Sequence, residues 1–339
     1  MGLARLGLAD ADVTGARRRA KLAVREILAE RPLANYGFIR RDPRRIRGRA
    51  GRRFAMDGMG IDLTALNLLR RAHQSGPLGE TVCLGRQGLH IKPEILRRRC
   101  GAALDWRNEP YAENMMRTLF GASRVDSIDN SPYEGAAILH DMNLPLPQDF
   151  RAYDTVIDAG TIEHIFDAAQ GFRNIVQLCK IGGQILHVTP TNNFCGHGFW
   201  QVSPELFFSL YAPEKGFSDT EVFLASRKRP DVWFKVMKPS GGARVPIMSS
   251  DKLYCICRTV RRAAAGAVGE VQQSNYLDHW KAGETPQAAD ASPSREKQGF
   301  GRRLGERLAH RFRRKLSRLN PNLTRIDVVD GRAPSIAAS

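Results

Sequence analysis

Three aspartates each stand at or just after the end of a short apolar run, where a carboxylate can accept hydrogen bonds from a ligand. Asp129, after the second such run, is placed to accept both hydroxyl hydrogens of a ribose, the usual task of an acid at that point of a nucleotide-binding sheet. Asp141 can accept from an exocyclic adenine amine while Met142 packs on the ring. The alternatives are an Asx-turn or N-cap at Asp129, with Asn130 supplying turn chemistry, and a plain turn at Asp141.

Small residues accompany these acids and leave room for a ligand. The first loop, LGRQGLH, contains Leu84, Gly85 and Gly88, and its glycines let the backbone approach a cofactor with no Cβ in the way. Asp158, Ala159 and Gly160 close a later run in the same manner. Two glycines after a strand are common, so a purely structural turn is the alternative for the first loop.

Glu163 and His164 follow at the mouth of the same predicted crevice, and His197 lies in a later polar loop that could form one wall of a substrate pocket. His164 and His197 are candidate general bases, with Glu163 as their orienter or as an alternative base. The alternative is that each histidine caps or packs. Glu163 and His164 alone make a thin site for a divalent cation, so we expect no metal.

The elements that must position these residues alternate between short apolar runs and helical segments, which indicates βαβ units. The pattern predicts a Rossmann-like α/β fold with a doubly wound, mostly parallel, seven-stranded sheet. Strands are expected over 81–85, 124–128, 153–158, 184–189, about 220–225, 232–237 and 252–258, and helices over 14–30, 61–73, 111–120, 168–180 and 204–211.

Charge divides the chain. The net charge is +17, yet residues 54–260 hold 22 basic and 22 acidic side chains, so the excess lies at the two ends. We therefore expect a catalytic core without a basic groove. The predicted parts are a basic N-terminal extension with helices (1–75), the Rossmann domain (76–260), a linker (261–294), and a basic amphipathic helix with a tail (295–339).

The run from Asp126 to Phe217 resembles the motifs of class I S-adenosylmethionine-dependent methyltransferases. The matching features are an acid closing the second strand (Asp129), an hDLP-like loop (Asp141, Leu144, Pro145), a D-x-GTLEH-like strand end (158–164) and a K-x-GG turn (Lys180, Gly182, Gly183). Over roughly 80–258 the chain also resembles an uncharacterised bacterial subgroup often associated with surface-glycan pathways. It departs from the class at Cys83, which stands where an acid is usual, and its first loop has only two glycines.

The resemblance implies S-adenosyl-L-methionine as cofactor and methyl transfer as the reaction. The residues after the strand at 153–158 do not form the Asp/Asn/Ser-Pro-Pro-aromatic loop of enzymes that methylate adenine amines. We therefore expect an oxygen acceptor on a small molecule or glycan precursor. The alternatives are a nucleic-acid methyltransferase or binder that uses the basic ends, although specific nucleic-acid binding is not favoured by the neutral core, and a catalytically silent nucleotide-fold scaffold.

The predicted location is the cytoplasm. Six cysteines without CxxC spacing indicate free thiols, no apolar stretch approaches the roughly 18 residues of a membrane span, and a signal-peptide pattern is absent. Residues 295–319 combine a repeating apolar face with Lys and Arg, so they could attach the protein to an anionic membrane at its inner face. A solvated or partner-binding helix is the alternative.

Overall fold

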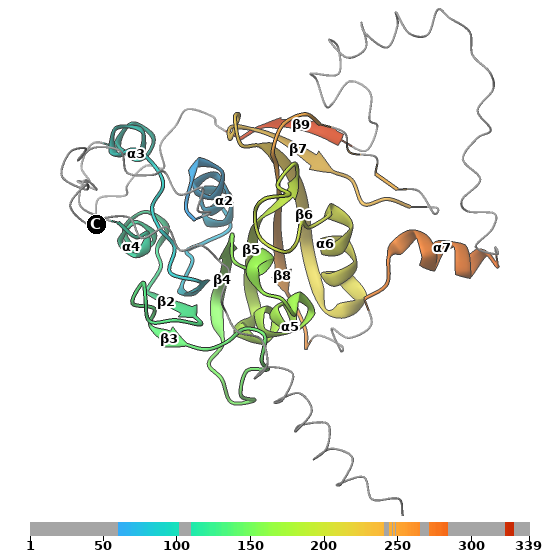
Figure 1. Cartoon of the computed structure of the whole chain (residues 1–339), viewed down its shortest axis with the longest axis horizontal. Helices are drawn as coiled ribbons and strands as arrows, with labels where there is room; N and C mark the ends of the chain where they lie inside the picture. The colour runs from blue at the N-terminus through green and yellow to red at the C-terminus, as the bar shows by residue number, and fades with distance from the viewer. Residues whose placement is uncertain are drawn as a thin grey trace, which may run out of the picture. The chain divides into compact units, whose positions relative to one another are not determined.

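The computed structural model describes residues 60–101, 110–240, 244–245, 247, 249–264, 271–283 and 323–328 (Figure 1). The predicted basic helix over 14–30 and the amphipathic helix over 295–319 both lie outside these residues. Within them, no helix is long and apolar enough to cross a membrane.

A single nine-stranded sheet organises the described residues. Its spatial order is β3-β2-β1-β4-β5-β8-β6-β7-β9, and Figure 1 shows β2 and β3 at one end of the sheet and β7 and β9 at the other. The strands are β1 (Glu80–Leu84), β2 (Arg124–Asp129), β3 (Ile138–Leu139), β4 (Tyr153–Ala159), β5 (Cys179–Asn192), β6 (Phe217–Ser226), β7 (Val232–Val236), β8 (Leu253–Arg261) and β9 (Leu323–Asp327).

All seven predicted strands are present, but the prediction of a mostly parallel, seven-stranded sheet is wrong in number and in direction. The five strands from β3 to β5 pair in parallel, whereas β8, β6, β7 and β9 continue the sheet in antiparallel pairs. The two missed strands have different causes. β3 is only two residues long, too short to show a pattern, and β9 lies in the basic tail and reaches β7 across the sequence.

Helices cover both faces of the sheet, as the alternating pattern predicts. Neighbouring strand residues point to opposite faces, so Val156 and Ile185 belong to one hydrophobic cluster while Ile157 and Leu186 belong to the other. The helical elements are α2 (Leu63–His73), α3 (Pro93–Cys100), α4 (Glu113–Phe120), η2 (Ile162–His164), α5 (Ala168–Leu178), α6 (Pro204–Leu210), η3 (Pro213–Lys215) and α7 (Ser274–Ala282).

Helix α2 confirms the helix predicted over 61–73 and packs into the core. Asp62 is its N-cap, accepting from the backbone N–H groups of Thr64 and Ala65 at 2.8 and 2.9 Å. Leu66 and Leu69 are buried among core residues that also include side chains of α4 and the sheet. The packed core therefore includes residues 61–72, which precede the predicted domain start at 76. Helix α7 likewise lies in the stretch whose composition predicts a linker.

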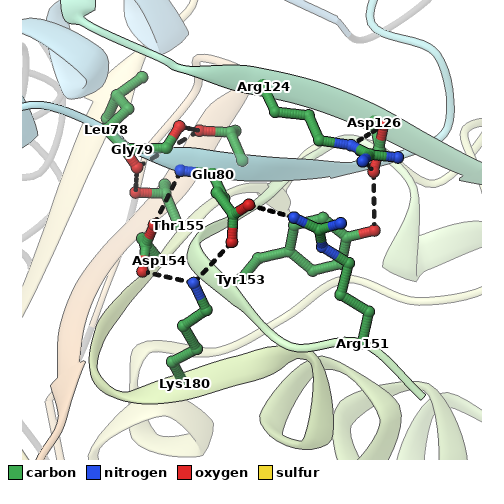
Figure 2. Close-up of polar contacts among 11 residues, drawn as sticks. Leu78, Gly79, Glu80, Arg124, Asp126, Arg151, Tyr153, Asp154, Thr155 and Lys180 are labelled. Atoms are coloured by element: carbon green, nitrogen blue, oxygen red, sulfur yellow. Dashed lines mark hydrogen bonds and ion pairs between the residues drawn. The ribbon is translucent and has the colours of Figure 1, made fainter.

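Ion pairs tie the amino ends of the parallel strands together (Figure 2). Lys180, at the start of β5, contacts Glu80 of β1 at 2.7 Å and Asp154 of β4 at 2.9 Å. Asp154 also accepts from the backbone N–H of Glu80 at 2.8 Å, and Arg151 pairs with the Glu80 carboxylate. The Lys180 hydrogen bond holds the pKa of Glu80 below its ordinary value.

The same edge is closed on the β2 side by a second set of contacts. Asp126 pairs with Arg124 at 2.7 Å and accepts from the Tyr153 hydroxyl at 2.9 Å. Burial and this hydrogen bond raise the pKa of Tyr153 to about 12. Thr155 donates to the carbonyl of Leu78 at 2.7 Å, joining β4 to the chain that enters β1. The carboxylates of this edge thus have partners from neighbouring strands.

Candidate functional site

A cavity of about 330 Å³ opens at the opposite edge, beyond the carboxyl ends of β1, β2 and β4. From β1 the chain builds the sheet outward through β2 and β3, then crosses back to β4 and β5 on the other side. A cavity at such a reversal of strand order is the usual ligand site of an open α/β sheet. Its lining is Gly85, Arg86, Gln87, Ile128, Asp129, Asn130, Glu134, His140, Asp141, Met142, Asn143, Gly160, Thr161, His164 and Ile165.

The wall after β1 requires a glycine at Gly85. Its φ of +66° lies in the left-handed region, and a Cβ there would stand 3.1 Å from the Thr161 hydroxyl. That hydroxyl donates to the carbonyl of Leu84 at 2.7 Å, so the ends of β1 and β4 are held close together. Leu84 is buried, and the carbonyl of Gly88 accepts from Ile61 N–H at 2.9 Å. Neither residue lines the cavity, although both were predicted to contact the cofactor.

Asp129 and Asn130 line the cavity where β2 ends. The Oδ1 atom of Asp129 accepts from the backbone N–H of Ser131 at 3.0 Å, which is the Asx-turn that the sequence left as the alternative. Its Oδ2 atom faces Gly85 and accepts no hydrogen bond from the residues that the structure describes. One oxygen therefore shapes the turn and the other is available to a ligand, so the two interpretations are compatible.

The loop after β3 brings Asp141 and Met142 to the same cavity. Asp141 Oδ1 accepts from the backbone and side-chain amides of Asn143 at 2.9 and 2.7 Å, and these bonds lower the pKa of Asp141. Met142 is buried in the core beneath the loop. Asn174 of α5 fixes the loop by donating to the carbonyl of Met142 at 3.1 Å. The loop thus presents a carboxylate beside an apolar floor.

Asp158 plays a different part from the one predicted for it. Its side chain is fully buried, with Oδ1 accepting from the N–H groups of Thr161 and Ile162 at 3.1 Å. Oδ2 contacts His187 Nδ1 at 2.8 Å, and His187 Nε2 contacts the Tyr211 hydroxyl at 2.7 Å. This buried chain of hydrogen bonds fixes the turn over 160–162. Ala159 is buried as well, and only Gly160 of the predicted trio lines the cavity.

Glu163, His164 and His197 meet at the mouth of the cavity. His197 Nε2 lies 3.4 Å from Glu163 Oε1, and His164 Nε2 lies 4.0 Å from the same atom. The side chain of Glu163 is completely buried, and neither of its oxygens has a hydrogen-bond partner among the described residues. Burial, followed by the charge of Asp158, raises the pKa of Glu163 to about 8. Burial lowers the pKa of His164, whose ring is half exposed and lines the cavity.

The loop that carries His197 folds directly over Glu163. The backbone N–H of Phe199 donates to the carbonyl of Glu163 at 2.7 Å. Gly198, with φ of +68°, passes so close that a Cβ would stand 2.8 Å from Glu163 Cγ. The side chain of Phe199 points outward and meets Phe166 edge to face, with centroids 6.0 Å apart. Both aromatic rings are largely exposed beside the cluster.

Sequence reasoning missed Arg86, which also lines the cavity. Its Nε pairs with Glu113 at 2.6 Å, its Nη1 donates to the carbonyl of Glu134 at 2.8 Å, and its guanidinium stacks 3.9 Å from the Tyr111 ring centroid. Its Nη2 makes no hydrogen bond with the residues described. The only signal in the sequence is its place between Gly85 and Gly88; its orientation depends on α4. That helix begins at Glu113, the residue whose carboxylate pairs with Arg86.

No protein-family model matches the chain, and no curated protein sequence matches it significantly. Solved structures with a related arrangement include a SAM-dependent methyltransferase of Thermotoga maritima, a possible histamine N-methyltransferase, at 14% identity and a TM-score of 0.34, covering 58% of this chain and 88% of that chain. The N-methyltransferase NodS of Bradyrhizobium japonicum, in complex with S-adenosyl-L-homocysteine, is similar at 15% identity and a TM-score of 0.33, covering 58% and 85%.

A third similar structure is the 1,6-didemethyltoxoflavin-N1-methyltransferase of Burkholderia thailandensis, with its substrate and S-adenosylhomocysteine bound. Its identity is 12% and its TM-score 0.34, and the match covers 77% of this chain and 94% of that chain. At such distances the function of the present chain has to be argued from the geometry of its own site.

Proposed function

We propose that this protein transfers a methyl group from S-adenosyl-L-methionine to an oxygen atom of a small molecule or glycan precursor. The observation that carries the proposal is the convergence of Gly85, Asp129, Asp141 and Met142 on one cavity at the switch point of the sheet. An adenosyl group needs a backbone segment that it can approach closely and a hydrogen-bond acceptor for its ribose hydroxyls. It also needs an acceptor for its adenine amine and an apolar surface beneath the adenine ring. These four residues offer those features in that order.

The residues fit the cofactor part by part. The cradle is the space beside Gly85 that a Cβ atom would fill. The available Oδ2 of Asp129 faces this space, where it could accept hydrogen bonds from the two ribose hydroxyls. Asp141 stands where an adenine amine would find an acceptor, with Met142 beneath the ring. Arg86, with Nη2 available, is the cationic group on this wall that could meet the cofactor's carboxylate.

Bound S-adenosyl-L-methionine would supply a methyl group activated by a sulfonium. The protein's task is then to align an acceptor oxygen with that carbon. The transfer would exchange the carbon–sulfur bond of the bound sulfonium for a carbon–oxygen bond, with the electron pair left on sulfur. The hydroxyl proton must leave as well, and Glu163, His164 and His197 are the titratable groups beside the cavity mouth that can assist its loss.

The proposal is tested first by calorimetry with S-adenosylhomocysteine. We expect binding at micromolar concentration, and we expect Gly85→Val to abolish it by filling the cradle. The matched control is Gly76→Val, because Gly76 also has a positive φ but lies at the amino edge with no atom near its Cβ position. Absence of binding at millimolar ligand would overturn methyl transfer and favour a silent nucleotide-fold scaffold.

The acceptor is tested next, with a methyl-labelled cofactor and a panel of hydroxyl-bearing and amine-bearing small molecules that includes nucleotide sugars. The carbon-13 chemical shift of the transferred methyl group distinguishes an O-methyl from an N-methyl product. We expect O-methyl products. A product methylated only on nitrogen would refute the oxygen assignment while leaving the cofactor site intact.

A further inference from the structure

Glu163, His164 and His197 lie closer together at the cavity mouth than the role of a general base requires. One ligand atom from each of Glu163, His164 and His197 can be chosen so that all three lie within 4.8 Å of one another. Glu163 and His164 come from η2, and His197 comes from the loop that folds back over it. We infer that this cluster binds one divalent transition-metal ion, with an open coordination position facing the methyl-transfer cavity.

The first argument is the Glu163 carboxylate. It is completely buried, and neither oxygen is hydrogen-bonded within the described part of the chain. A buried carboxyl group without partners destabilises a fold, and proteins keep such groups where a cation or a catalytic task compensates for them. The ion-paired carboxylates at the opposite, amino edge of the sheet show that this chain supplies Lys and Arg partners where the role is structural. For Glu163 the neighbours are two imidazoles.

The second argument is the spacing. The Glu163–His197 separation of 3.4 Å lies beyond the usual range of an N–H···O hydrogen bond. It is the separation expected when both atoms bind the same ion, because ligands about 2.0–2.2 Å from a metal at tetrahedral or octahedral angles stand roughly 3–3.5 Å apart. His164 Nε2 lies 4.0 Å from the same oxygen, and its side chain is half exposed.

The third argument is the chemistry of the ligand set. Two imidazole nitrogens and one carboxylate oxygen suit Zn²⁺, Co²⁺, Mn²⁺ or Fe²⁺, whereas Mg²⁺ and Ca²⁺ prefer oxygen ligands. Three protein ligands leave at least one position for water or substrate, which distinguishes catalytic from closed structural sites. His164 lines the cavity beyond β1, β2 and β4, so an acceptor in that cavity would lie beside the ion.

Binding of the metal does not depend on the proposed function, but its role does. A hydroxyl bound to the ion would have a lowered pKa, so its proton would pass to solvent before the oxygen attacks the methyl carbon. The cluster then acts as a ligand set that fixes the acceptor oxygen. The proximity of Phe166 and Phe199 would place the remainder of the acceptor against exposed aromatic rings.

The test uses the untagged full chain, stripped with a chelator and titrated with Co²⁺ and Zn²⁺. We expect one equivalent to bind and the Co²⁺ form to show visible absorption bands with imidazole ligation. His197→Ala and Glu163→Gln should each weaken binding at least tenfold. His140→Ala is the matched control, because His140 lines the same cavity outside the cluster. Cys195→Ser controls for the exposed thiol two residues before His197.

Circular dichroism and melting curves identify any variant that fails to fold, and His164→Ala then provides the additional ligand variant. Binding that persists in His197→Ala and Glu163→Gln, or that disappears only in Cys195→Ser, would overturn the site. The same preparations are titrated with S-adenosylhomocysteine. Cofactor binding without metal binding refutes the metal site alone, and metal binding without cofactor binding refutes the methyltransferase proposal alone.

Discussion

At the amino edge of the sheet, the carboxylates of Glu80, Asp126 and Asp154 are paired with Lys, Arg or Tyr side chains from neighbouring elements. At the carboxyl edge, Glu163 is more deeply buried than any of them and its oxygens have no hydrogen-bond partner among the described residues. Asp129 keeps one oxygen available in the same way. Native folds satisfy most buried polar groups, and leaving a buried carboxylate such as Glu163 without a partner costs more than leaving a neutral group, which points to a functional demand there.

The size of a hollow does not reveal this difference. The larger hollow, about 750 Å³, lies at the amino edge, yet its charged lining is largely paired within the protein. Asp154 pairs with Lys180, Glu221 pairs with Arg71 at 2.6 Å and with Lys235 at 3.2 Å, and Asp219 pairs with Arg262. The carboxyl-edge cavity is less than half that volume, but its acids have oxygens to offer a ligand. Unused hydrogen-bonding capacity therefore locates the site better than volume.

The largest expected effect comes from replacing one aspartate at each edge and comparing the two variants. Asp129→Ala should weaken S-adenosylhomocysteine binding by about 10- to 100-fold, because charge-assisted hydrogen bonds to a ribose contribute about 1.5–3 kcal/mol. Asp154→Ala should leave that affinity unchanged within twofold and lower the melting temperature instead. Calorimetry and thermal melts on both variants give the two readouts.

Asp129→Asn separates the two roles of that residue. The amide oxygen can still accept from Ser131 N–H, so the turn should survive while the ribose contacts weaken. Equal losses of affinity in the Asn and Ala variants would agree with a role in the ligand site. Full affinity in the Asn variant would instead mean that the turn is all that the cavity requires.

The candidate site residues that the structure brings to the cavity are those whose place depends on one strand at a time. Gly85, Asp129 and Asp141 each follow a strand or loop, and parallel strands necessarily bring such ends to one edge. The sequence could not predict contacts between side chains that the fold alone brings together. The Asp158 carboxylate, which was predicted to bind the cofactor, instead contacts His187, 29 residues further along the chain. The packing of the His197 loop over Glu163 is likewise a tertiary contact that the sequence pattern does not show.

The same limit applies to the fold. The strands from β1 to β8, apart from the very short β3, have apolar runs long enough to recognise, and each was predicted to within a few residues at most of its bounds, except for the longer β5. β9 was missed because its pairing with β7 depends on a partner far along the chain, and basic composition dominates the surrounding sequence. The predicted boundary at residue 76 leaves α2 outside the Rossmann domain, although α2 packs in its core. The apolar face of that helix could not be assigned to this core from the sequence, because its packing partners lie in other elements of the fold.

A second, smaller effect concerns stability at the carboxyl edge. In metal-free protein, Glu163→Met should raise the free energy of unfolding by about 1–3 kcal/mol, because an unsatisfied buried carboxyl group is replaced by an apolar chain of similar length. Denaturant unfolding measures this change, and methyl transfer should be lost in the same variant. A stabilised but inactive protein is the signature of a site that sacrifices stability for function. A destabilised one would mean that Glu163 is a structural residue after all.

The smallest expected effect lies at the amino edge and depends on pH. Lys180 lowers the pKa of Glu80 through their hydrogen bond, so this pair stabilises the fold above the ordinary carboxyl pKa and loses that contribution as pH falls through the lowered value. Lys180→Met should therefore lower the melting temperature at pH 7 by roughly 1–3 °C, the modest effect expected of a partly exposed ion-pair network. At an acidic pH below the lowered pKa values of Glu80 and Asp154, the two proteins should differ much less, because both carboxylates that Lys180 contacts are then protonated. An equal difference at both pH values would show that Lys180 acts through its packing, and that the charged network of Figure 2 is not what holds this edge together.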